Sequence, residues 1–197
     1  MTDVANAVFD GTDAVQLGGE TANGEFPVES VRTTAEITRN AEQATNYYAV
    51  FSFIRDLSAK PFSMAESVAS SVCKNVVDCK ASLVLTFSST GSSAQLISKS
   101  RPPVPVVVVT DDPRTAREMA LSFGLAAYVV PALGESLAML PNLVNSALEH
   151  AHDKGLVAGS GPVVLVHGVT EPDADDTVTM RILDSPEVKV SRNSITI

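Results

Sequence analysis

One short run of residues limits the choice of fold more than any other feature of the sequence. Residues 105–110, PVVVVT, place four consecutive valines after a proline. A β-branched run without polar alternation is typical of a strand that is buried on both faces, and such strands occur in parallel sheets covered by helices on both sides. The sequence therefore predicts an α/β domain in which residues 105–110 form an interior strand.

Strand and helix patterns alternate on both sides of this run. Short apolar, β-branched segments separated by helical stripes are typical of a parallel sheet with helices on its faces. We expect a three-layer α/β domain with a mostly parallel five-stranded sheet over residues 58–185. The predicted strands are residues 82–86, 105–110, 126–130, 162–167 and 177–183.

The helices between these strands are predicted from capping residues and apolar stripes. Ser63 and Glu66 have the spacing of a capping box, and Asp112 with Pro113 opens a second helix. A third helix is expected over residues 92–100. The apolar stripes consist of Ala65, Ala69, Val72, Val76 and Cys79 in the first helix, and Leu137, Leu140, Val144, Ala147 and Ala151 in a later one.

Residues 1–57 are predicted to form a separate N-terminal domain. A helix over residues 3–10, a short strand over 13–17 and a glycine-rich loop precede a helix that starts at Pro27. Helix–strand–loop–helix is the repeating unit of an α/β barrel or a doubly wound sheet. The last helix continues a stripe as far as Phe51, and SAKPF (58–62) breaks the pattern. The tail 186–197 alternates weakly, which fits either a frayed end or an edge strand.

The chain carries a formal net charge of −9. Nucleic acids and anionic membranes would repel such a chain, so neither is expected as a partner. Its apolar runs fall short of the ~20 residues of a membrane-spanning helix, and the N-terminus lacks the basic start and apolar core of a signal peptide. Cys73 and Cys79 point to different sides of one predicted helix, so reduced thiols and a cytoplasmic location are expected.

A polar loop follows the first strand of the predicted α/β domain. Its hydroxyl side chains surround a glycine at the start of a helix, where free N–H groups and a partial positive charge favour a phosphate. The same residue types also favour a plain helix cap, so both interpretations stay open. The loop is neither a Walker loop nor a G-x-G-x-x-G motif. The candidate phosphate ligands are Ser88, Ser89, Thr90, Gly91, Ser92 and Ser93.

No metal site is predicted. His150 and His152 lie two positions apart on a helix and face different sides, and His167 ends a strand without cysteine or carboxylate partners at ligand spacing. The acidic run after it fits a solvated loop, because it lacks the spaced ligands and glycine of a calcium loop. That run contains Glu171, Asp173, Asp175 and Asp176.

Three segments of the sequence resemble the pyruvate kinase family. TDVANAVFDGTDAVQLGGETANGEFPVESV (2–31) is similar to the last helix–strand–loop–helix of the family's barrel. STGSSAQLISKSRPPVPVVVVT (89–110) and TMRIL (179–183) resemble the effector loop and the last strand of its C-terminal domain. The resemblance implies that residues 1–57 are a remnant of a (β/α)₈ barrel and that residues 58–185 are the C-terminal regulatory domain.

The resemblance also implies a reaction, in which phosphoenolpyruvate and ADP give pyruvate and ATP. The family's phosphoryl-stabilising lysine and its ligands for Mg²⁺ and K⁺ correspond to positions before Met1, so no cofactor is expected in this chain. We expect the chain to be a C-terminal fragment that is inactive alone. The family is tetrameric, which implies a homo-oligomer.

Two departures from the family pattern stand out. The usual S-G-E-T is here Gly18-Gly19-Glu20-Thr21. The family's Ser and Glu support proton delivery, so Glu20 is expected to keep only part of that role. The basic residues and Gly-rich loop that complete the sugar-bisphosphate pocket are replaced by the acidic run. We expect a weak or absent response to fructose bisphosphate, and a phosphate monoester bound by the polar loop at roughly 0.1–10 mM.

Two other functions compete with the fragment. One is a non-catalytic module that senses a sugar phosphate or binds full-length subunits. The other is a truncated reading frame without a function of its own, which the start at Met1, within a helix of the family barrel, favours.

Overall fold

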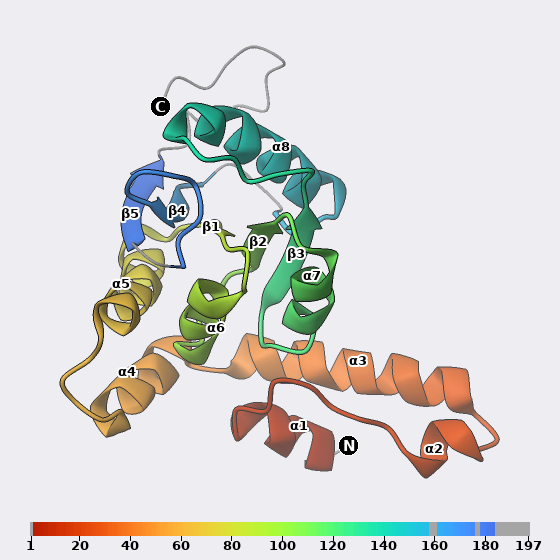
Figure 1. The fold of residues 1–197 in the computed structure, drawn as a ribbon. Helices are drawn as coiled ribbons and strands as arrows, with labels where there is room; N and C mark the ends of the chain where they lie inside the picture. The colour runs from red at the N-terminus through yellow and green to blue at the C-terminus, as the bar shows by residue number, and fades with distance from the viewer. Residues whose placement is uncertain (1, 158–160, 176–177, 184–197) are drawn as a thin grey trace. The chain divides into compact units, whose positions relative to one another are not determined.

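The computed structural model describes residues 2–157, 161–175 and 178–183. The chain divides into two compact units, Met1–Asn46 and Tyr47–Ile197, and Figure 1 shows the elements of each along the chain. Helix α4 (Tyr47–Leu57) groups with the second unit, although the sequence analysis placed these residues in the first domain. The tail 186–197 lies outside the described residues.

The second unit is built on one five-stranded sheet with the order β3-β2-β1-β4-β5. The first four strands in sequence run parallel, and β5 pairs antiparallel to β4. All five residues of β2 are buried, as the valine run predicts. The strands are β1 (Leu83–Phe87), β2 (Val106–Thr110), β3 (Leu125–Val129), β4 (Val163–Gly168) and β5 (Val178–Leu183).

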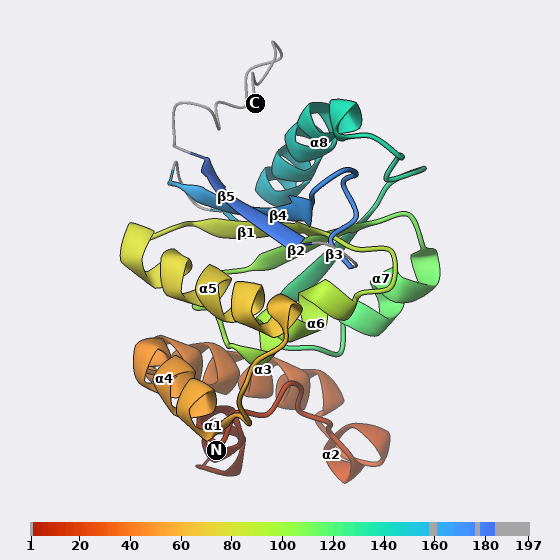
Figure 2. The same cartoon turned by 60° about the vertical axis from the view of Figure 1, so that its left-hand side comes forward.

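Helices cover both faces of the sheet, so the predicted three-layer fold is confirmed. Figure 2 shows α8 (Leu140–Asp153) on one face, with α5 (Met64–Cys79), α6 (Ser92–Lys99) and α7 (Pro113–Met119) on the other. Successive residues of a strand point to opposite faces. Leu83, Leu85 and Phe87 of β1 accordingly pack in the α8 core, while Val84 packs with residues of α5 and α6.

Local signals fix the helix ends as predicted. The Ser63 hydroxyl accepts a hydrogen bond from the Glu66 N–H, and the Glu66 carboxylate accepts one from the Ser63 N–H, which completes the capping box of α5. The Asp112 carboxylate accepts hydrogen bonds from the N–H groups of Arg114 and Thr115 at the start of α7. A 3₁₀ turn, η1 (Leu137–Met139), leads into α8, so Pro141 sits in its first turn.

The first unit contains α1 (Thr2–Phe9), α2 (Gly19–Ala22) and α3 (Pro27–Ala44). The predicted strand at 13–17 is wrong for this structure, because these residues form no strand. A strand exists only with a hydrogen-bonded neighbour, and none of the described residues supplies one. Ala41 is the only buried residue of the three helices.

The stripe that predicts one long helix up to Phe51 is interrupted. Thr45 adopts an extended conformation, and its hydroxyl donates a hydrogen bond to the Ala41 carbonyl at 2.9 Å. Thr and Asn side chains compete with the helix for backbone hydrogen bonds. Thr45 and Asn46 therefore separate α3 from α4.

Candidate functional site

Two loops meet at the carboxyl edge of the sheet. Strands β1 and β4 are adjacent and parallel, while the chain continues from β1 to β2 on the other side. The order of the strands therefore switches between β1 and β4, and open α/β sheets bind ligands at the carboxyl ends of strands beside such a point. The polar loop follows β1, and the acidic run follows β4.

The polar loop is held in a tight turn. Gly91 has φ = 84°, a left-handed conformation that favours glycine, and its N–H donates to the Ser88 hydroxyl at 2.7 Å. The Thr115 hydroxyl of α7 donates to the Ser89 carbonyl at 2.8 Å. A Cβ at Gly91 would lie 2.6 Å from the Met119 side chain. The turn thus needs glycine both for its conformation and for close packing against α7.

The carboxylate of Asp175 lies inside this turn. Its Oδ1 accepts hydrogen bonds from the Ser88 hydroxyl at 2.6 Å, the Ser92 hydroxyl at 3.0 Å and the Ser93 N–H at 3.2 Å. Its Oδ2 accepts hydrogen bonds from the Thr90 N–H and the Thr90 hydroxyl, both at 2.8 Å. The donors that the sequence analysis assigned to a phosphate are therefore engaged by a side chain of the same protein.

These contacts favour the charged form of Asp175. Burial alone would raise its pKa, but hydrogen bonds from Ser88, Thr90 and Ser93 outweigh that effect and lower the pKa to about 2. The carboxylate is thus an anion under ordinary conditions. It faces two backbone N–H groups near the start of α6, where the helix dipole also stabilises negative charge.

Asp173 extends the contact between the two loops. Its Oδ2 accepts a hydrogen bond from the Ser89 hydroxyl, and its Oδ1 accepts one from the Asp175 N–H at 3.1 Å. Burial raises the pKa of Asp173, and the charge of Asp175 adds to the increase. The prediction of a solvated acidic loop is therefore wrong for these two residues, which are half-buried, while Glu171 is exposed. Asp176 lies outside the described residues.

The backbone of the acidic loop is also anchored. The Ala174 N–H donates to the Phe87 carbonyl at the end of β1 at 2.9 Å, and Ala174 is fully buried. The Gly168 N–H donates to the Pro172 carbonyl at 3.1 Å. The segment from Gly168 to Asp175, which we call the acidic loop, therefore delivers its carboxylates from a fixed position.

Replacing Gly168 by alanine is expected to displace the acidic loop. An added Cβ would lie 2.2 Å from the Asp173 carbonyl oxygen and 2.5 Å from that of Glu171, so the backbone itself must move. Forcing an extra group into a packed site costs about 1–3 kcal/mol. Gly168→Ala should lower the free energy of unfolding by at least that amount, measured by urea denaturation, and shift the amide resonances of residues 88–93.

Gly124→Ala is the matched control. Gly124 has φ = 69°, but nothing lies within 4 Å of an added Cβ, so this variant has backbone strain without a clash. It should cost about 1–2 kcal/mol and leave the resonances of residues 88–93 unchanged. Equal shifts of these resonances in both variants would contradict the packing argument.

Glu20, the candidate catalytic residue, is exposed on the short helix α2 of the first unit. Its Oε2 accepts a hydrogen bond from the Gly18 N–H at 3.0 Å. Hydrogen bonds from its own N–H and from that of Gly18 lower its pKa. Glu20 lines an open hollow of about 540 Å³ together with apolar residues such as Val4, Val15 and Ile37. At Gly18, an added Cβ would meet only Glu20 Oε2, at 3.8 Å, so a serine fits there.

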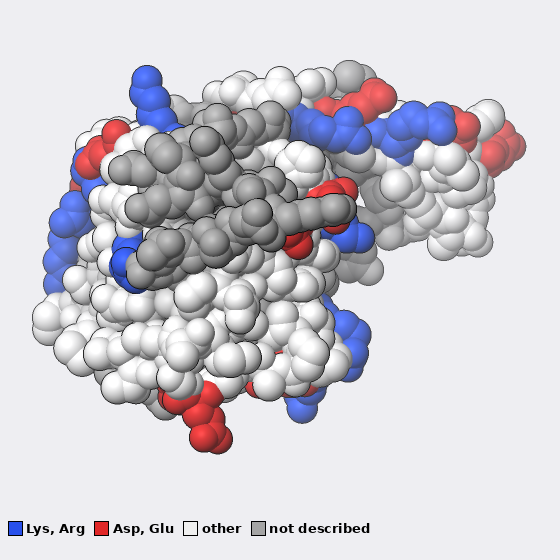
Figure 3. Space-filling view, turned by 90° about the horizontal axis from the view of Figure 1, so that it is seen from above, with Lys and Arg blue, Asp and Glu red and all other residues white. Residues whose placement is uncertain are grey.

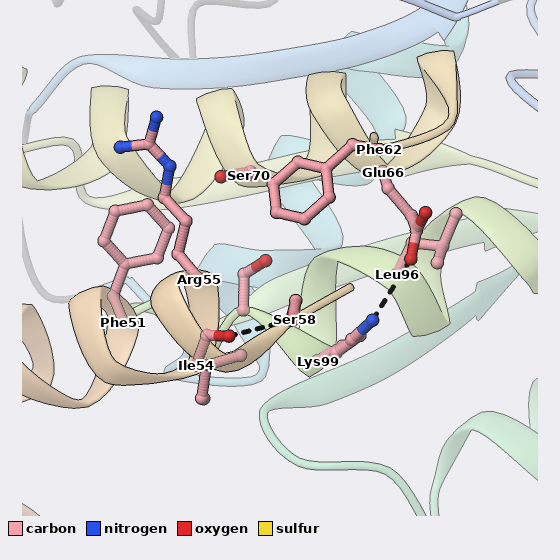
Figure 4. A pocket seen from close by; sticks show the side chains of 10 residues that line it. Phe51, Ile54, Arg55, Ser58, Phe62, Glu66, Ser70, Leu96 and Lys99 are labelled. Carbon is pink, nitrogen blue, oxygen red and sulfur yellow. Dashed lines mark hydrogen bonds and ion pairs between the residues drawn. The ribbon is translucent and has the colours of Figure 1, made fainter. Parts of the chain in front are cut away.

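The α/β unit contains a cavity that is too small to be a ligand site. Figure 4 shows it between α4 and α5, where Phe51, Arg55 and Phe62 point toward it and the Lys99–Glu66 ion pair closes one end. Its volume of about 20 Å³ holds about one water molecule. This cavity therefore has no room for a ligand larger than a water molecule.

The other sequence candidates do not form a metal site in the described part of the chain. No group of three His, Cys, Asp or Glu side chains there is placed to hold a metal ion. His150 stacks on Tyr128 with ring centroids 4.4 Å apart. Both cysteines are free, and burial raises the pKa of Cys73 to about 12. Such a thiol stays protonated and unreactive.

The described helices and one face of the molecule bear on whether a membrane or a nucleic acid could be a partner. None of the helices within the described ranges is long and apolar enough to cross a bilayer. On the face in Figure 3, Lys and Arg side chains are spread around the edge rather than gathered in one patch. The absence of such partners stays a prediction.

Comparison with known families gives the decisive observation. The family model described as "Pyruvate kinase, alpha/beta domain" matches residues 66–183, and "Pyruvate kinase, barrel domain" matches residues 1–31. The chain belongs to the pyruvate kinase family. The resemblance of segments 2–31, 89–110 and 179–183 is thereby confirmed.

Pyruvate kinases of several organisms are similar over most of this chain. The enzyme of Dictyostelium discoideum is 42% identical over 185 residues, and that of Clostridium acetobutylicum is 35% identical over 168 residues. These matches cover 92% and 85% of this chain but only 36% and 34% of the relatives. A crystal structure of a pyruvate kinase from Cryptosporidium parvum has 34% identity and a TM-score of 0.83, and the match covers 94% of this chain and 35% of that one.

Sequence reasoning missed Asp175 and Asp173 as partners of the polar loop. Both stand more than 80 residues from the serines that they contact. The sequence does show that both residues follow the predicted strand 162–167. That position predicts a contact with the polar loop only once the strand order is known, because β4 lies beside β1.

Proposed function

We propose that this chain supplies the last barrel unit and the C-terminal domain of a pyruvate kinase. The assembled enzyme would transfer a phosphoryl group from phosphoenolpyruvate to ADP. The observation that carries this proposal is the match of both family models, in family order, to residues 1–31 and 66–183. We retain 1–57, 58–185 and 186–197 as its proposed domain division.

Within that enzyme, we assign Glu20 a supporting role. Its exposed carboxylate lines the open hollow of the first unit and is held by the Gly18 N–H. Family members use Mg²⁺ and K⁺, but the described residues offer no cluster that could hold a metal. The described residues therefore do not fit a metal-binding role. Family membership also supports a homo-oligomer and a cytoplasmic location as proposals.

A chimera tests the proposal. These 197 residues would replace the aligned segment of the Dictyostelium discoideum enzyme, to which they are 42% identical. The chimera is expected to form pyruvate from phosphoenolpyruvate and ADP in a lactate dehydrogenase-coupled assay. An inactive chimera with the circular dichroism and oligomeric state of the parent would overturn the proposal.

Gly18→Ser in the same chimera is expected to increase kcat by about tenfold or more, because a positioned proton-transfer group contributes about 10²–10⁴-fold and Glu20 supplies only part of it. Gly19→Ala is the matched control, since nothing lies within 4 Å of a Cβ there. It should leave kcat unchanged. Equal kcat values for all three chimeras would remove the proton-delivery argument and leave the family assignment intact.

The second candidate is a module that binds a phosphate monoester at the polar loop. The loop has the position and the donors for it, at the carboxyl edge beside the β1–β4 switch. The Asp175 carboxylate holds those same donors, so binding requires its displacement. We therefore rank this function below the first.

A further inference from the structure

We propose that Asp175 is a built-in anion that occupies the polar loop and closes it to phosphate. The inference uses only the geometry of the α/β unit and does not rest on the proposed catalytic function. It assigns the acidic loop a regulatory role: the loop takes the place of an effector.

The Asp175 carboxylate already occupies the hydrogen-bond donors that a phosphate would need. Both carboxylate oxygens are saturated by donors from the polar loop, two of which are backbone N–H groups. A phosphate bound at a helix start would use such N–H and hydroxyl donors. Two anions cannot share these donors, so occupation by Asp175 and by phosphate is mutually exclusive.

The Asp175 carboxylate belongs to a segment that is anchored beside the polar loop. The Ala174 N–H bonds to the Phe87 carbonyl immediately before the polar loop, so Asp175 is delivered from a neighbouring, anchored residue. A tethered group competes at an effective concentration of about millimolar or more. A free anion with a millimolar affinity for neutral donors would therefore be excluded at ordinary concentrations.

Negative charge beside the polar loop also opposes the binding of a phosphate. An incoming phosphate would meet Asp173, whose carboxylate bonds to Ser89, in addition to Asp175. Like charges about 4 Å apart near a protein surface repel by about 4 kcal/mol. The groups of the polar loop that bond to Asp173 and Asp175 are neutral hydroxyl and N–H donors, so no cation within these contacts offsets this repulsion. The acidic loop must move away before an anion can enter.

One buried group shows that the loop has unused donor capacity. Ser93 is 6% exposed, and its hydroxyl lacks a hydrogen-bond partner among the described residues. Buried hydroxyls without partners are rare in native proteins. Asp175 therefore satisfies the Ser93 N–H but not the Ser93 hydroxyl.

The test is an NMR titration of the full chain with inorganic phosphate and, separately, fructose 6-phosphate, at constant ionic strength. The wild-type chain is expected to show no saturating shift of the Thr90 or Ser93 amides up to 20 mM ligand. Asp175→Ala removes the internal anion and is expected to bind phosphate at least tenfold more tightly, with saturating shifts at these amides. A gain for fructose 6-phosphate beyond that for inorganic phosphate would identify a sugar-phosphate preference.

Glu171→Ala is the matched control. It removes one negative charge from the same loop, but Glu171 is exposed, whereas Asp175 is half-buried against the polar loop. It should behave like the wild type. If Asp175→Ala does not fold, as judged by circular dichroism, Asp175→Asn is titrated instead and judged by the same criterion.

Three results would overturn the proposal. The first is saturating binding to the wild type as tight as to the Asp175 variant. The second is an equal gain in Asp175→Ala and Glu171→Ala, which would show a general effect of charge. The third is a folded Asp175 variant that binds neither ligand, which would reduce Asp175 to a cap of α6.

Discussion

A polypeptide of these 197 residues is expected to form no pyruvate above background when it is incubated with phosphoenolpyruvate, ADP, Mg²⁺ and K⁺. Phosphoryl transfer depends on positioned charges and metal ions around the transferred group. The described residues contain no cluster of side chains that could hold a metal. Glu20 is exposed, and residues 13–17 form no strand to present it.

The geometry of the first unit explains why no pyruvate formation is expected. A barrel active site is built from loops that follow several different strands. Here one such loop borders an open hollow of about 540 Å³, which cannot exclude water or fix two substrates in line. Positioning contributes about 7–11 kcal/mol to catalysis, so its absence should reduce turnover below detection.

The lactate dehydrogenase-coupled assay also needs a test for a contaminating enzyme, and Glu20→Gln provides it. Residual turnover that is equal in the wild type and Glu20→Gln belongs to a contaminant. Turnover by the wild type that saturates with phosphoenolpyruvate and falls in Glu20→Gln would contradict the prediction. It would mean that the single barrel unit assembles a site, for instance between copies of the chain.

The α/β fold could be predicted because its signals are local. The valine run 105–110 specifies an interior strand, and Ser63 with Glu66 specifies a helix start, whatever the rest of the chain does. The strand predicted at 13–17 failed for the opposite reason. Its apolar pattern is local, but its hydrogen bonds must come from neighbouring strands, and the described residues contain none for it.

The sequence predicts the polar loop of the candidate site but not the carboxylate that fills it. Hydroxyls, a glycine and a helix start identify the polar loop from consecutive residues. The side chain that fills the loop comes from Asp175, and its place depends on the pairing of β4 with β1. The composition of the acidic run therefore favours a solvated loop, although the fold leaves Asp173 and Asp175 only half-exposed.

The two units are expected to differ strongly in local stability. In β2, every residue is buried and the strand pairs on both sides with β1 and β3. In the first unit, α1 and α2 bury no residue, and α3 buries only Ala41. Short helices without an apolar core are marginal in water.

Hydrogen exchange of the full chain measures this difference directly. Core strands open only with global unfolding, which costs about 5–15 kcal/mol, whereas weakly packed segments open at close to zero cost. Each 1.4 kcal/mol is about a factor of ten, so the amides of Val107 and Val109 should exchange at least about 10³-fold more slowly than those of Val8 and Phe9.

The C-terminal end of α3, where Ala41 is buried, provides an internal comparison. The Thr45 N–H donates a hydrogen bond to the Glu42 carbonyl, and the Thr45 hydroxyl donates one to the Ala41 carbonyl. This end of α3 should be protected more than α1 and less than β2. If residues 2–9 are protected as strongly as 106–110, the first unit is stabilised by packing that its own side chains do not provide. The view of it as a weakly held barrel remnant would then be wrong.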